Sequence, residues 1–128
     1  DEKAVQTGYF PGWCTGSVTR VEEAHDLAGT PPTSLHIVPG WFDETLSHQV
    51  EAIGPIALLH VDADWYDSVY TVFETLYSHV VSGGVVVIDD YGSWSGCRRA
   101  LEDFFGDPAF QALEIRSIDG HAVYFVKP

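Results

Sequence analysis

The sequence predicts an α/β fold with a mostly parallel sheet, and two short apolar segments carry this prediction. Residues 56–61 (IALLHV) and 85–88 (VVVI) are continuous apolar runs, and each of them ends on acidic residues. Runs of this kind, rich in β-branched residues, are typical of strands that are covered on both faces, as in parallel sheets. Residues 68–80 between them are long enough for the crossover helix that two parallel strands require.

Aspartates follow both predicted strands directly. Asp62 and Asp64 come after the first strand, and Asp89 and Asp90 come after the second. Because open α/β sheets bind ligands at the carboxyl ends of their strands, we expect these side chains to converge. Converged carboxylates repel one another unless they share protons or hold a cation, and oxygen ligands suit Mg²⁺. We therefore predict a metal site at Asp62, Asp89 and Asp90, and only for Asp67 do we favour a helix-capping role.

Composition indicates one soluble globular domain, residues 1–128, with a loop-like N-terminal segment at 1–16. The chain is 45% hydrophobic and 20% charged, as globular proteins are. Its net charge of −13 disfavours nucleic acid as a partner. No apolar run is long enough to span a membrane, and we expect a cytoplasmic protein. Because the sequence contains no Met, even at position 1, we expect that something upstream of Asp1 was removed or is not included in this sequence.

The first part of the chain predicts one strand between two helices. A helix capped by Ser17 stops near Gly29, a strand covers 35–38, and a second helix follows Trp41 and ends near Gly54.

The second part predicts the rest of the sheet. A crossover helix follows Asp67, and Ser82-Gly83-Gly84 turns the chain into the strand that ends at Asp89. Another helix covers 97–105. Residues 112–118 and 122–126 then flank Asp119-Gly120, which predicts a hairpin and an antiparallel sheet edge. The apolar stripe of the crossover helix comprises Val69, Val72, Phe73, Leu76 and Tyr77.

Four motifs in this order resemble the successive signatures of the macrocin O-methyltransferase (TylF-like) family. They are VPGWFDETL at 38–46, LHVDADWYDS at 59–68, GGVVVIDDYG at 83–92 and CRRA at 97–100. The resemblance runs from about Ser17 to the C-terminus. It implies a Rossmann-like, class I methyltransferase that uses S-adenosylmethionine and Mg²⁺. Its partner would be a small-molecule hydroxyl acceptor, typically on a sugar of a natural product.

The resemblance also implies roles for individual residues. Asp62, Asp89 and Asp90 match the metal-binding aspartates of the family, in agreement with the strand-end argument. The base that accepts the proton of the hydroxyl stays open between Asp62 and Asp64, and His121 is a weaker candidate.

A further motif is implied to lie near the cofactor. Gly40, Trp41 and Phe42 match the segment beside the adenine, whereas His60 is expected to pack inside its strand. The strand, glycine-rich turn and helix that receive the cofactor in this fold are not found in the sequence. In the family's sheet, the strands of this missing segment stand between the third and the fourth strand. The chain thus resembles the C-terminal half of a methyltransferase domain, incomplete at the N-terminus.

Two other interpretations remain at this stage. One is a noncatalytic, truncated methyltransferase-like module that forms a homodimer through exposed sheet edges. The other is a haloacid dehalogenase-like phosphatase, because Asp62-Ala63-Asp64 resembles the nucleophile motif of that class. Against the phosphatase, Tyr66 stands where Thr or Val is expected, and no suitably placed lysine follows.

Overall fold

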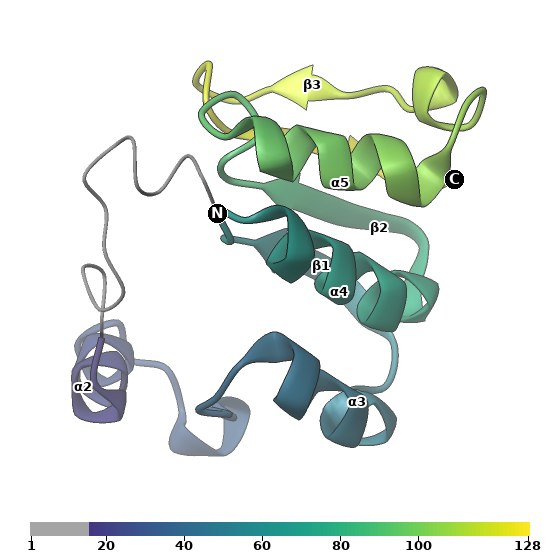
Figure 1. Ribbon diagram of the computed structural model, residues 1–128. Coiled ribbons are helices and arrows are strands. Elements are labelled where there is room, and N and C mark those ends of the chain that lie inside the picture. Colours follow the sequence, from purple (N-terminus) through teal and green to yellow (C-terminus); the bar gives the residue numbers. More distant parts are fainter. Residues whose placement is uncertain (1–15) are drawn as a thin grey trace. The chain divides into compact units, whose positions relative to one another are not determined.

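The computed structural model describes residues 16–128 (Figure 1). The chain divides into two compact units, Asp1–Gly40 and Trp41–Pro128, and each is described by itself. Apart from Gly16, the loop-like segment expected at 1–16 lies outside the described residues, and the single domain expected for 1–128 stays a prediction. No helix among residues 16–128 is long and apolar enough to cross a membrane, and the cytoplasmic location also stays a prediction.

The described part of the first unit is built around helix α2, Val18–Leu27. The side chain of Ser17 caps it and accepts a hydrogen bond from the backbone N–H of Arg20 at 3.2 Å. Gly29, with a φ of +71°, follows the end of the helix. The predicted cap and stop of this helix are confirmed.

The prediction of a strand at residues 35–38 is wrong. After a 3₁₀ turn at Pro32–Ser34, these residues have no regular structure. A strand exists only when a neighbouring strand takes up its backbone hydrogen bonds. No described strand pairs with 35–38, because the four-stranded sheet lies wholly within the second unit.

The second unit contains a four-stranded mixed sheet with the order β1-β2-β4-β3. Strands β1 and β2 are parallel, and β4 is antiparallel to both β2 and β3. The predicted α/β class and the antiparallel C-terminal hairpin are confirmed. The strands are β1 Ile56–Val61, β2 Val80–Ile88, β3 Arg116–Ser117 and β4 Val123–Val126.

Helices α4, Tyr66–Leu76, and α5, Ser95–Phe105, cover one face of this sheet, and α3, Phe42–Ile53, packs beside α4 (Figure 1). The predicted stripe of α4 is buried, except that Tyr77 lies in the 3₁₀ turn that follows and is half-buried. Phe73 is fully buried among aromatic rings of α5. The buried residues of the two covering helices are Val69, Val72, Phe73, Leu76, Cys97, Ala100 and Leu101.

The other face of the sheet is open within the second unit. Leu59 and Val61 are buried on the helix-covered face, but Leu58 is 61% exposed and the His60 side chain is 53% exposed. Side chains alternate along a strand, so Leu58 and His60 point to the face opposite the helices. The expectations that β1 is covered on both faces and that His60 packs inside are therefore wrong for this unit.

Glycines lie inside β2 rather than before it. The pairing register with β1 shifts between Ile56 and Leu58, and Gly83 has a φ of +80° at this irregularity. A Cβ on Gly84 would lie 2.8 Å from the carbonyl oxygen of Val81. The expected turn at 82–84 is therefore a bulge within the strand, where the missing side chains let the backbones approach.

Replacing Phe73 by Ala should lower the free energy of unfolding by about 3–5 kcal/mol, because it leaves a large cavity between α4 and α5. Urea unfolding followed by circular dichroism measures this change. Leu58→Ala, on the open face, is the control and should cost much less. Equal losses for the two variants would contradict the assignment of the core to the helix-covered face.

Candidate metal centre

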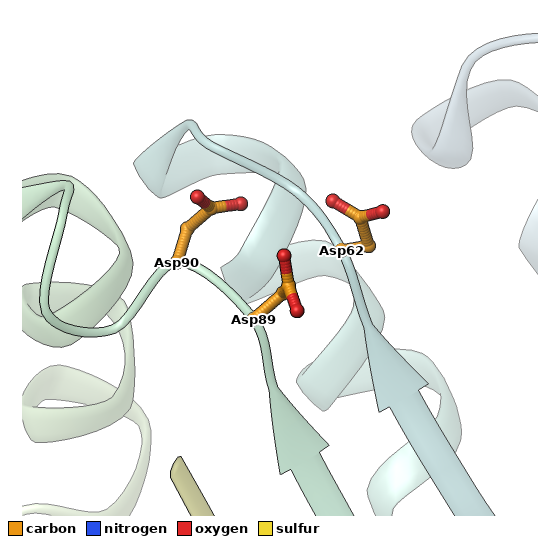
Figure 2. Close-up of side chains that lie close together, drawn as sticks. All are labelled: Asp62, Asp89 and Asp90. Atoms are coloured by element: carbon orange, nitrogen blue, oxygen red, sulfur yellow. The ribbon is translucent and has the colours of Figure 1, made fainter. Parts of the chain in front are cut away.

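Strands β1 and β2 end side by side and bring their aspartates together. Val61 pairs with Ile88, and the backbone N–H of Asp89 donates to the Val61 carbonyl at 2.9 Å. The residues after the last pair, Asp62 and Asp89, are therefore neighbours at the carboxyl edge of the sheet. Figure 2 shows their carboxylates converging with that of Asp90.

The three carboxylates are close enough to share one ion. One oxygen from each of Asp62, Asp89 and Asp90 lies within 4.8 Å of the others. Asp62 is exposed, and Asp89 and Asp90 are half-buried. This set of hard oxygen donors fits a divalent cation such as Mg²⁺, and its partial exposure leaves room for water or substrate oxygens.

A fourth carboxylate, that of Asp64, belongs to the same cluster. Partial burial, the charge of Asp64, a hydrogen bond with Asp64, and the charges of Asp89 and Asp62 raise the pKa of Asp90 to about 6. Without a cation, therefore, the pKa of Asp90 lies well above that of an ordinary carboxyl group. The predicted convergence of these four side chains is what the structure shows, whereas metal binding stays a proposal.

His60 stands beside this cluster, which the sequence reasoning did not anticipate. Its Nε2 lies 3.7 Å from Oδ1 of Asp89, on the open face of the sheet. The signal was present in the sequence: strand alternation places residue 60 opposite the buried Leu59 and Val61.

His121, the weaker candidate for the base, lies at the end of the β3–β4 turn. Its side chain is exposed as expected, but Nδ1 is 2.8 Å from the hydroxyl oxygen of Ser93. The ring is therefore engaged with the loop after β2.

The segment predicted to lie near the cofactor contributes to a pocket at the start of α3. Trp41 is 73% exposed, and it lines a pocket of about 370 Å³ together with Phe42. Gly40 is the last residue of the first unit and is not part of this pocket. The remaining lining residues are Asp43, Asp67, Ser68 and Thr71.

Asp67 is not the cap of α4. Trp65 holds the N-cap position without a side-chain hydrogen bond, and Asp67 lies in the first turn. There its negative charge interacts favourably with the helix dipole.

Replacing Asp90 by Asn should change how stability depends on pH. A carboxyl whose pKa rises from 3.8 to about 6 on folding makes the native state lose stability as pH increases from about 4 to 6. Asp90→Asn removes this loss, so the variant should gain stability relative to the wild type between pH 4 and pH 7. Urea unfolding across this range measures the difference. Asp43→Asn is the control, and an unchanged pH profile in Asp90→Asn would contradict the proposed cluster.

Comparison with known proteins identifies the family of the chain. Residues 14–127 match the family Macrocin-O-methyltransferase (TylF). Demethyldecarbamoylnovobiocin O-methyltransferase of Streptomyces niveus is 33% identical over 91 residues, which are 71% of this chain and 34% of the relative. A Streptomyces olivaceus enzyme, 8-demethyl-8-(2,3-dimethoxy-alpha-L-rhamnosyl)-tetracenomycin-C 4'-O-methyltransferase, is 34% identical over 96 residues, which are 71% of this chain and 33% of the relative.

The fold agrees with this match. The structure of the O-methyltransferase NovP superposes with a TM-score of 0.76 at 29% identity, over 87% of this chain and 45% of NovP. The chain thus spans about a third of the length of the curated relatives and just under half of NovP. The predicted methyltransferase sheet is confirmed, and the chain belongs to the macrocin-O-methyltransferase (TylF) family.

Proposed function

We propose that the chain forms the metal-binding part of an S-adenosylmethionine- and Mg²⁺-dependent O-methyltransferase that acts on a hydroxyl of a small molecule. The observation that carries this proposal is the convergence of Asp62, Asp89 and Asp90 in a member of this family. A sugar of a natural product is the proposed acceptor, because the tetracenomycin relative is named for the 4' hydroxyl of a rhamnosyl group. Since the chain spans only part of its relatives, the proposed activity is that of the whole enzyme.

The metal centre would prepare the acceptor hydroxyl. Asp62, Asp89 and Asp90 would hold Mg²⁺, which supplies a positive charge that lowers the pKa of a hydroxyl bound to it. Partial burial and the mutual repulsion of the carboxylates together raise the pKa of Asp90, and a cation that they surround would relieve the repulsion.

Asp64 is the proposed base. Once the other three aspartates serve as ligands, Asp64 is the carboxylate of the cluster that remains to accept a proton, and it lies close enough to Asp90 for its charge to raise the pKa of that residue. When bound, the donor would supply a methyl group, and its carbon–sulfur bond would break as the acceptor oxygen bonds to the methyl carbon. Asp64 would take up the hydroxyl proton, and the products would be a methyl ether and S-adenosylhomocysteine.

The pocket at Trp41 and Phe42 is the proposed contact for the adenine of the donor. An exposed indole offers a flat apolar surface on which a purine can stack. The sequence segment that cradles the rest of the donor in this fold has no counterpart among residues 1–128, so the pocket is one part of a larger site.

The comparisons bear on the phosphatase and on the noncatalytic module in different ways. The family match leaves the haloacid dehalogenase-like phosphatase without support. The noncatalytic module and its homodimer remain the alternative, and donor binding separates that interpretation from the proposed enzyme.

The chain should bind Mn²⁺, used as a probe of the Mg²⁺ site, in a saturable manner by isothermal titration. The double variant Asp89→Asn with Asp90→Asn should lose this binding, because two of the three anionic ligands become neutral. The control is Asp43→Asn with Glu44→Gln, which removes the same charge from the first turn of α3. If both double variants bound Mn²⁺ as the wild type does, the assignment of the metal centre to these aspartates would be wrong.

Titration with S-adenosylmethionine, with and without Mg²⁺, tests the donor site. If the chain binds the donor, Trp41→Ala should weaken binding about tenfold, as expected for the loss of one stacking surface. Leu58→Ala, which removes an exposed apolar side chain elsewhere, should leave binding unchanged. Donor binding that is unchanged in Trp41→Ala would contradict the adenine contact, whereas saturable binding by the wild-type chain would count against the noncatalytic module.

A further inference from the structure

We infer that the β3–β4 turn positions the proposed metal ligand Asp90, by clasping the loop that follows β2. The clasp is defined as Gly92 and Ser93 of that loop together with Gly120 and His121 of the turn. This inference rests on the proposed metal centre. It assigns to His121 a positioning role, in which His121 acts through the loop that carries Asp90 and does not contact the reacting atoms.

The loop folds back immediately after Asp90. The carbonyl oxygen of Asp90 accepts hydrogen bonds from the backbone N–H groups of Ser93, at 3.1 Å, and Trp94, at 2.9 Å. Asp90 is thus the first residue of a tight turn, and Gly92 lies near its tip. Movement of the tip would therefore move the backbone that carries the Asp90 carboxylate.

The clasp joins this tip to the hairpin by backbone and side-chain contacts. The N–H of Gly92 donates to the carbonyl of His121 at 2.8 Å, and the hydroxyl oxygen of Ser93 lies 2.8 Å from Nδ1 of His121. A Cβ on Gly92 would lie only 2.5 Å from the carbonyl oxygen of Gly120. The two segments are in such close contact that only glycine fits at position 92.

The hairpin side of the clasp is itself held in place. Oδ1 of Asp119 accepts from the N–H groups of His121, at 2.9 Å, and Ala122, at 2.8 Å. Directly beyond the turn, Val123 pairs with Ile88, the last residue of β2. The turn is therefore anchored to the same strand that carries Asp89 and Asp90, so it can act as a fixed support.

Such a support matters at this position because the carboxylates of Asp62, Asp89 and Asp90 lie within 4.8 Å of one another and repel each other. Without a cation, this repulsion opposes the convergence of Asp90 with Asp62 and Asp89. A loop held from outside keeps the ligand oxygens converged, so less free energy is spent on reorganisation when the cation binds.

The test is Mn²⁺ affinity, measured by isothermal titration and by the electron paramagnetic resonance signal of free Mn²⁺. The variants Ser93→Ala and His121→Ala should each bind Mn²⁺ about tenfold more weakly, as is typical for groups that orient metal ligands. The double variant should lose little more than either single one, because both remove the same contact. His121→Asn, whose amide can reach the position of Nδ1, should restore part of the affinity.

Phe125→Leu separates positioning from stability. Phe125 is buried in β4 and pairs with Val86, away from the clasp and its anchor, so the variant should lower the melting temperature and leave Mn²⁺ affinity unchanged. Gly92→Ala should weaken Mn²⁺ binding further than the side-chain variants, because the added methyl group forces the loop and the turn apart.

The outcomes distinguish this inference from the proposed function. Unchanged Mn²⁺ affinity in Ser93→Ala and His121→Ala, with normal binding by the wild type, would overturn the clasp and leave the metal centre intact. Independent, additive losses in the double variant would also overturn it. Absence of Mn²⁺ binding by the folded wild-type chain would overturn both.

Discussion

The parallel pairing of β1 with β2 is the interaction on which the rest of this structure depends. Parallel strands end at the same edge, and the register that pairs Val61 with Ile88 makes Asp62 and Asp89 neighbours. Had the register slipped by one residue, every side chain of β1 would have exchanged faces, and the acidic residues would no longer meet. The crossover helix α4 is what makes the parallel pairing possible, because it returns the chain to the start of the sheet.

The core on the helix-covered face stabilises an acidic edge that is unfavourable by itself. The aromatic side chains of α4 and α5 pack around Phe73, and the same helices begin close to the two acidic loops. Trp65 and Trp94, which precede α4 and α5, contact each other with ring centroids 5.3 Å apart. The loops that carry the carboxylates are thus joined to the core at their far ends, which opposes electrostatic repulsion at the sheet edge.

Residues 41–128 leave the opposite face of the sheet and the outer edge of β1 uncovered. The chain matches a third of its curated relatives and just under half of NovP, so these relatives contain more chain than the four strands described here. This agrees with the lack of regular structure at 35–38, a segment that has strand-forming residues but no neighbouring strand among those described. It also agrees with the exposure of Leu58 and His60.

The sequence by itself determined the local elements and the identity of the acidic residues. The stripe of α4, the strands that end at Asp62 and Asp89, and the Asp119-Gly120 hairpin follow from periodicity and turn chemistry, which act over a few residues. The tertiary structure alone decided that one face of the sheet is open, that Asp64 acts on the pKa of Asp90, and that His121 reaches Ser93. These features depend on which distant segments meet, and a local pattern carries no information about that.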